Sequence, residues 1–172
     1  MQTEQPWTRR ATQEDTSWMV DLSGRVQHAL TASGCLHVIG PLLLENTERS
    51  IFGENAFVLE NEEKRLGAVL VDPLESSQLV QWALPSEASP WWYLHSLMLE
   101  PEEQGKRLGL AFLQGVKRMM APLSGSIVLD CWAGNAKLRD FYERAGFTGH
   151  GIFPVQDFEV MVFVYSLAVS SS

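Results

Sequence analysis

The chain has few cysteines, no long apolar run and a shortage of basic residues. Its two cysteines, Cys35 and Cys131, lie far apart and have none of the spacings typical of a metal or redox site. No apolar run approaches the roughly 20 residues that a membrane helix requires. The N-terminal residues also lack the charged-then-apolar order of a signal peptide. These absences favour a cytoplasmic protein with free thiols, no bound metal and no membrane partner.

Acidic residues outnumber basic ones, 21 to 13, and the formal net charge is −8. A general nucleic-acid binder needs the opposite balance, because Lys and Arg make most phosphate contacts. An acidic surface does steer cationic substrates, although solubility alone is the commoner reason for such a charge. The length of 172 residues suits a single domain over residues 1–172 with a substantial core. Nothing distinguishes a monomer from a homodimer.

Hydrophobic periodicity predicts strands and helices in the order β-α-β-β-β-α-β-α-β-β. We expect strands at 7–11, 56–60, 66–71, 91–99, 127–132, 147–152 and 159–167, and helices at 13–32, 108–119 and 135–145. Segment 40–53 is either irregular or briefly helical, and segment 72–90 is typical of a polar loop. The order implies an α+β fold, with a mixed sheet and helices on its faces. The unit from 91 to 132 is expected to be a right-handed parallel crossover.

The segment from Leu97 to Leu110 is typical of a phosphate-binding turn. An apolar strand leads into a loop with small and basic residues, and the loop opens a helix. The first turn of a helix offers unpaired backbone N–H groups and the positive end of the helix dipole. Gly105 and Gly109 leave the backbone accessible, while Lys106 and Arg107 add positive charge. An ordinary helix start with packing glycines would give the same pattern.

The segment from Ile127 to Phe147 predicts a strand followed by a sharply bounded helix. Asn135 is a good N-cap residue, and Gly146 suits the left-handed position after a helix. Tyr142 lies two turns beyond Asn135 on the same face, roughly 10 Å along the axis, so one ligand arm would touch both. A core tyrosine and a simple helix cap are the structural alternatives.

Both segments resemble motifs of the GNAT superfamily, whose members are acetyl-coenzyme A-dependent N-acetyltransferases. The loop is similar to motif A, [QR]-x-x-G-x-[GA], except that Arg107 replaces the middle glycine. An arginine N–H still binds phosphate there, provided that its φ is negative. The second segment is similar to motif B, N-x-x-x-x-x-[FY]-Y-x-x-x-G-F.

The resemblance implies a mostly antiparallel sheet of six to seven strands with a splayed pair of parallel strands. It also implies acetyl-CoA as cosubstrate, with the thioester near Tyr142, which would protonate the leaving thiolate. The coenzyme-binding residues implied by it are Leu97, Met98, Leu99, Gln104, Gly105, Lys106, Arg107, Leu108, Gly109, Asn135, Lys137 and Tyr142. Backbone N–H groups of Leu97–Leu99 would hold the oxyanion if the strand bulges there.

His95 stands in a mostly apolar strand, two residues after Tyr93 and therefore on the same side. A buried core histidine is the usual explanation for such a position. The run from Leu94 to Leu97, however, resembles the strand of arylalkylamine N-acetyltransferases that carries two histidines for proton removal. His95 matches the second of them and Tyr93 replaces the first. We therefore expect His95 to be the base or a proton relay, with Glu100 as a second candidate.

The sequence thus predicts an enzyme that transfers acetyl directly from acetyl-CoA to a primary amine of a small molecule or peptide. An ammonium with a pKa of roughly 10 must first lose a proton, and neither cysteine stands in a nucleophile–base pattern. Trp82, Trp91, Trp92 and the loop 85–90 are candidates for an amine pocket. Two alternatives remain open, namely a non-catalytic acyl-CoA sensor of the same fold and a structural domain that binds nothing.

Overall fold

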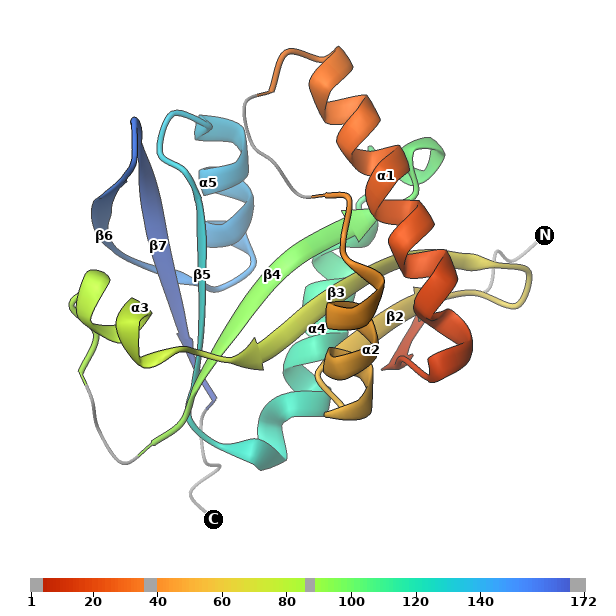
Figure 1. The fold of residues 1–172 in the computed structure, drawn as a ribbon, viewed down its shortest axis with the longest axis horizontal. Helices are drawn as coiled ribbons and strands as arrows, with labels where there is room; N and C mark the ends of the chain where they lie inside the picture. The colour runs from red at the N-terminus through yellow and green to blue at the C-terminus, as the bar shows by residue number, and fades with distance from the viewer. Residues whose placement is uncertain (1–4, 36–39, 86–88, 168–172) are drawn as a thin grey trace. The chain divides into compact units, whose positions relative to one another are not determined.

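A computed structural model describes residues 5–35, 40–85 and 89–167 of the chain. Its seven strands form a sheet in the order β1-β2-β3-β4-β5-β7-β6 (Figure 1). The strands are β1 (Trp7–Arg10), β2 (Ala56–Glu60), β3 (Arg65–Pro73), β4 (Trp91–Leu99), β5 (Ser126–Trp132), β6 (Thr148–Val155) and β7 (Phe158–Ser166). The helices are α1 (Thr16–Ala32), α2 (Leu44–Phe52), α3 (Ser76–Gln81), α4 (Leu108–Met120) and α5 (Ala136–Arg144).

The α+β fold class and the predicted order of elements are confirmed. β4 and β5 run parallel, with a register from Trp91 opposite Ser126 to Tyr93 opposite Val128. The pairs β1–β2, β2–β3, β5–β7 and β6–β7 are antiparallel. No helix in the described ranges is both long enough and apolar enough to cross a membrane.

The chain forms two compact units, which we describe separately. Unit 1 comprises Met1–Val71 and Ser96–Val116, and unit 2 comprises Asp72–His95 and Lys117–Ser172. Strand β4 and helix α4 each contribute residues to both units. A single domain over residues 1–172 stays a prediction.

In unit 1, α1 covers one face of the β2–β3 hairpin. Met19, Leu22 and Val26 recur at helical spacing and are buried against alternate residues of the two strands. Those strand residues are Ala56, Val58, Ala68 and Leu70. The side chain of Thr8 on β1 meets α4 instead, where a Cβ on Gly115 would lie 2.1 Å from the Thr8 hydroxyl oxygen. The close approach of this part of α4 to β1 therefore requires glycine at 115.

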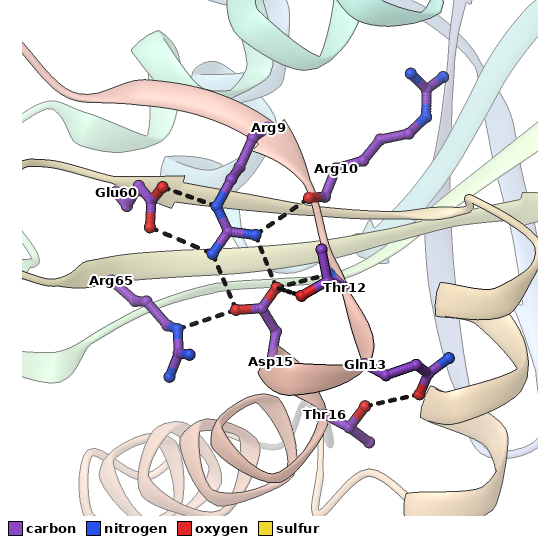
Figure 2. Close-up of polar contacts among 8 residues, drawn as sticks. All are labelled: Arg9, Arg10, Thr12, Gln13, Asp15, Thr16, Glu60 and Arg65. Atoms are coloured by element: carbon purple, nitrogen blue, oxygen red, sulfur yellow. Dashed lines mark hydrogen bonds and ion pairs between the residues drawn. The ribbon is translucent and has the colours of Figure 1, made fainter.

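A buried ion cluster joins β1 and the β2–β3 hairpin to the start of α1 (Figure 2). The carboxylate of Asp15 is 1% exposed and accepts two hydrogen bonds from Arg9, at 2.7 and 2.9 Å. Arg65 lies 3.0 Å from the same carboxylate, and Arg9 also binds Glu60 at 2.7 Å. Because a buried carboxylate is stable only when paired, the cluster fixes how α1 enters the unit.

In unit 2, the turn that follows α3 packs on one face of β5 and β7. Trp82 and Leu84 are buried against Val128, Val160 and Val162. Helix α5 packs on the other face, since Tyr142 contacts the ring of Phe163, the neighbour of Val162 on β7. The unit therefore has a helical segment on each side of its strands.

The prediction of a polar loop over 72–90 is wrong in its first half, where the structure contains α3. α3 is six residues long, less than two turns, and its apolar Val80 is exposed, so hydrophobic periodicity could not reveal it. Its formation follows from the packing of Leu79 and Trp82 on the strands, a tertiary effect. Residues 86–88 of this segment lie outside the described ranges. For segment 40–53, the helical one of the two predicted alternatives is confirmed, because α2 occupies Leu44–Phe52.

Candidate functional site

The predicted phosphate-binding loop lies in unit 1, between β4 and α4. A single 3₁₀ turn, Pro101–Glu103, follows the strand, and α4 begins at Leu108. Residues Gln104 to Arg107 are exposed and contribute no side chain to the core. The N–H groups at the start of a 13-residue helix therefore face solvent, as an anion site requires.

The condition stated for phosphate binding by the Arg107 N–H, a negative φ, is not met, because φ is 61° there and 84° at Gly105. Lys106, between them, is not among the residues with positive φ. Alternating handedness of this kind directs successive backbone N–H groups into one concavity, which favours anions. At Arg107 a non-glycine residue thus adopts the left-handed conformation that glycine adopts freely. The loop thus keeps the turn of the motif without its middle glycine.

We expect Arg107→Gly to raise the melting temperature by roughly 2–4 °C. The left-handed conformation of a non-glycine residue costs about 1 kcal/mol, which glycine relieves. Thermal unfolding measures the change. Arg107→Ala is the matched control, because alanine removes the guanidinium but keeps the strain, and it should give no increase. An equal increase in both variants would show that the side chain, not the backbone, is unfavourable.

Of the two basic residues in the loop, Lys106 has an acidic partner among the described residues and Arg107 does not. Lys106 lies 3.1 Å from Glu103, and Glu103 also binds Lys64 at 2.6 Å. Those hydrogen bonds lower the pKa of Glu103. Lys106 therefore reaches a phosphate only by leaving a partner, whereas no described residue pairs with Arg107.

Glu100, the second candidate for the base, is buried at the end of β4, where Arg25 donates hydrogen bonds to both of its carboxylate oxygens. Both carboxylate oxygens of Glu100 are therefore already engaged by Arg25.

In unit 2, α5 is bounded as the sequence predicts. The side-chain oxygen of Asn135 accepts a hydrogen bond from the Leu138 N–H at 3.0 Å, and Gly146 follows the helix with φ of 92°. Because its oxygen caps the helix, Asn135 has only its amide NH₂ to offer a ligand. Lys137, another predicted coenzyme contact, is exposed on the same helix.

Lys117, which the sequence did not single out, anchors the C-terminal end of α5. Its buried Nζ donates to the carbonyl of Ala145 and lies 4.9 and 4.0 Å from the ring centroids of Phe147 and Tyr165. Burial lowers the pKa of Lys117. A cation is favourable at a helix C-terminus and over aromatic faces, so this contact holds the helix that carries Tyr142.

The hydroxyl of Tyr142 has no protein acceptor among the residues that the structure describes, although the residue is only 6% exposed. Its ring is fixed by Phe141, Phe147 and Phe163, with centroid distances of 5.2, 6.0 and 5.8 Å. Burial raises the pKa of Tyr142, and the nearby charge of Asp130 raises it further. Tyr142 is therefore a protonated donor held in place by its neighbours, and its O–H donates to no described residue of the protein.

His95 and Tyr93 lie on the same side of β4, as predicted. Their rings stack with centroids 5.0 Å apart and 21° between planes. Two carboxylates that the sequence did not identify hold them. Asp72 Oδ2 lies 2.7 Å from His95 Nε2, and the Tyr93 hydroxyl donates to Asp130 Oδ1 at 2.6 Å. Both contacts join residues more than 20 positions apart, so no local pattern marks them.

Strand β4 is irregular next to His95, because Ser96 has φ of 56°. A non-glycine residue in this region costs about 1–3 kcal/mol, and such strain is common at functional sites. A bulge was expected near Leu97–Leu99, and the backbone irregularity that the structure contains lies at Ser96, the residue immediately before that segment. Leu97 and Leu99 are half-buried, and Met98 is buried in the core of unit 1, so only its backbone is available.

The three candidate tryptophans do not line one pocket. Trp91, with Leu84 and Pro85, lines a cavity of about 260 Å³ in unit 2. Trp82 is buried with its ring edge toward Tyr93, at a centroid distance of 5.7 Å. Trp92 points to the opposite side of β4 and donates to the carbonyl of Ser124. Alternation along the strand therefore excludes a pocket shared by Trp91 and Trp92.

Cys131 is not a nucleophile at neutral pH. Burial raises the pKa of its thiol to about 11, and the charge of Asp130 adds to this effect. Among the described residues there is also no group of three His, Cys, Asp or Glu side chains that would hold a metal ion.

Comparison with known proteins identifies the family and the fold. The profile of the acetyltransferase (GNAT) family matches residues 35–147. No curated protein sequence matches the chain. A GNAT family acetyltransferase from Listeria monocytogenes superposes with a TM-score of 0.77 at 19% identity, covering 94% of each chain.

Two further solved structures share the fold. The yncA protein of Salmonella typhimurium, solved with its cofactor acetyl-CoA, gives a TM-score of 0.71 at 14% identity over 98% of both chains. The ribosomal-protein-S18-alanine N-acetyltransferase of Escherichia coli gives 0.64 at 15% identity over 97% of both. At these identities the likeness concerns the fold.

Proposed function

Because the chain belongs to the acetyltransferase (GNAT) family, we propose that it is an enzyme that transfers an acetyl group from acetyl-CoA directly to a primary amine. The acceptor is a small molecule or a peptide, and no metal takes part. Proteins of the same fold support the proposal, since one holds acetyl-CoA and another is an N-acetyltransferase. A cytoplasmic location and a monomeric or dimeric state remain predictions from the sequence.

One observation carries the proposal, namely the left-handed Gly105 and Arg107 immediately before α4. These residues turn the loop so that its N–H groups and those of the first helical turn suit a diphosphate. In this proposal the backbone from Gln104 to Gly109 binds the diphosphate of the coenzyme. Lys106 and Arg107 add charge, and Asn135 and Lys137 contact the pantetheine arm.

Each remaining residue then has one chemical role. His95 accepts a proton from the acceptor ammonium, which leaves a neutral amine able to attack the thioester carbonyl. Backbone N–H groups of Leu97–Leu99 stabilise the negative charge that develops on the carbonyl oxygen. Tyr142 donates its proton to the departing thiolate. Since the Cys131 thiol stays protonated, an acyl-enzyme is not part of the proposal.

Acetyl-CoA at 100 times its Kd should stabilise the protein by about 2.7 kcal/mol, because it binds only the folded chain. Thermal unfolding with and without the coenzyme measures this gain. S-acetyl-N-acetylcysteamine, which carries the thioester but no diphosphate, is the matched control and should give little stabilisation. Equal stabilisation by both compounds would contradict a diphosphate site, and none by either would contradict the proposed function.

Release of free thiol from acetyl-CoA over a panel of primary amines then separates an enzyme from a sensor. The panel should include polyamines, arylalkylamines, amino sugars and peptides with free N-termini. Turnover with one class identifies the acceptor. Stabilisation by acetyl-CoA without turnover on any amine would instead favour the acyl-CoA sensor.

A further inference from the structure

We infer that Asp72 is a positioning residue that fixes the tautomer and orientation of His95, an inference that rests on the proposed function. The Oδ2 atom of Asp72 lies 2.7 Å from Nε2 of His95. Asp72 stands near the end of β3, and its side chain is 27% exposed, while that of His95 is 29% exposed. Both side chains are therefore mostly shielded but partly accessible to solvent.

The contact determines which ring nitrogen is basic. A carboxylate only accepts hydrogen bonds, so Nε2 of His95 must carry the hydrogen that lies between the two groups. In the neutral imidazole the lone pair is then on Nδ1, so Nδ1 is the nitrogen that becomes protonated when the acceptor ammonium loses its proton. The step converts R–NH₃⁺ and neutral His95 into R–NH₂ and an imidazolium. The proton then passes to solvent.

The stacked ring of Tyr93 restricts the same histidine from a second side. Its hydroxyl donates to Asp130 at 2.6 Å, and the edge of Trp82 packs against the ring. Burial raises the pKa of Tyr93, and the charge and hydrogen bond of Asp130 raise it further. Tyr93 therefore remains a neutral phenol that does not compete for the proton. The stacked ring of Tyr93 therefore limits the tilt of the His95 ring, and the hydrogen bond to Asp72 fixes the direction in which Nε2 points.

Kinetics of Asp72→Asn test the role, using an acceptor found with the amine panel. An asparagine NH₂ can donate to Nε2 and so favours the wrong tautomer. We expect kcat to fall roughly 10²-fold with little change in KM. In a His95→Ala background, Asp72→Asn should cause no further loss, because Asp72 acts only through His95. A further loss of similar size in that background would overturn the inference.

The tautomer gives a second readout that needs no activity. Nitrogen-15 NMR of the wild-type protein, at a pH where the imidazole is neutral, should show His95 with its hydrogen on Nε2. Asp72→Asn should move this hydrogen to Nδ1. The matched control is Asp157→Asn in the exposed β6–β7 turn, which should change neither the tautomer nor kcat. A wild-type hydrogen on Nδ1 would overturn the inference even if Asp72→Asn failed to fold.

The experiments distinguish a failure of the proposed function from a failure of the role inferred for Asp72. Absence of turnover with every amine would remove the proposed function but would leave the tautomer as a test of the Asp72–His95 pair. Turnover that is unaffected by Asp72→Asn would support the enzyme and remove Asp72 from it.

Discussion

Tyr142→Phe is expected to lower kcat roughly 10²- to 10⁴-fold while acetyl-CoA affinity stays nearly unchanged. The phenol of Tyr142 remains protonated, because burial raises its pKa, and no described residue accepts its hydrogen bond. Its one role in the proposal is to protonate the leaving thiolate, which exists only as the reaction proceeds. Steady-state kinetics give kcat, and calorimetric titration gives the affinity.

The matched control for this substitution is Tyr165→Phe. Tyr165 is a half-buried tyrosine of the same unit whose ring contacts Phe147 and the Lys117 ammonium. It has no role in the proposed chemistry, so its loss of a hydroxyl should leave kcat unchanged. Because the Tyr142 hydroxyl has no described protein partner, neither substitution should unfold the chain. A Tyr142→Phe enzyme with wild-type kcat would remove Tyr142 from the mechanism.

Asp15→Ala is expected to reduce the free energy of unfolding by about 3 kcal/mol. Removing one member of a buried ion cluster costs about 3–5 kcal/mol, because the remaining charges lose their partner. The low end of that range applies, since the Arg9 and Arg65 side chains are 30% and 35% exposed and can recover water. Urea unfolding at neutral pH measures the change.

Asp21→Ala is the control for this prediction, because Asp21 is exposed on the same helix, α1. It should change the stability by less than about 0.5 kcal/mol. An equally small effect of Asp15→Ala would show that the cluster does not stabilise the fold.

The Asp15 effect should also depend on pH. Burial by itself would raise the pKa of Asp15, but hydrogen bonds from Arg9 and Thr12 and the charges of Arg9 and Arg65 outweigh it, so the pKa is lowered. A carboxylate with a lowered folded pKa stabilises the protein above its unfolded pKa, near 4, and loses this contribution as the pH falls. The difference between wild type and Asp15→Ala should therefore shrink below about pH 4. A constant difference down to pH 3 would contradict the assignment.

Local signals made much of the site predictable. The N-cap at Asn135 and the left-handed Gly146 depend on contacts within a few residues, so the bounds of α5 were correct to one residue at each end. The loop before α4 was identified for the same reason. Its conformation at Arg107 was not, because a non-glycine residue rarely adopts a positive φ and nothing local in the sequence marks the exception.

The sequence by itself determined the order of elements, the two motif segments and the side of β4 that His95 shares with Tyr93. Only the tertiary structure decided that Asp72 and Asp130 hold those two rings and that α3 forms. The same is true of the ion cluster, in which Asp15 binds Arg9 and Arg65, and Arg9 also binds Glu60. Caps, turns and alternation are short-range and leave a pattern along the chain. Strand pairing, by contrast, brings together residues that are far apart in the sequence. The position of a single aspartate in the sequence therefore does not indicate which side chain it will contact.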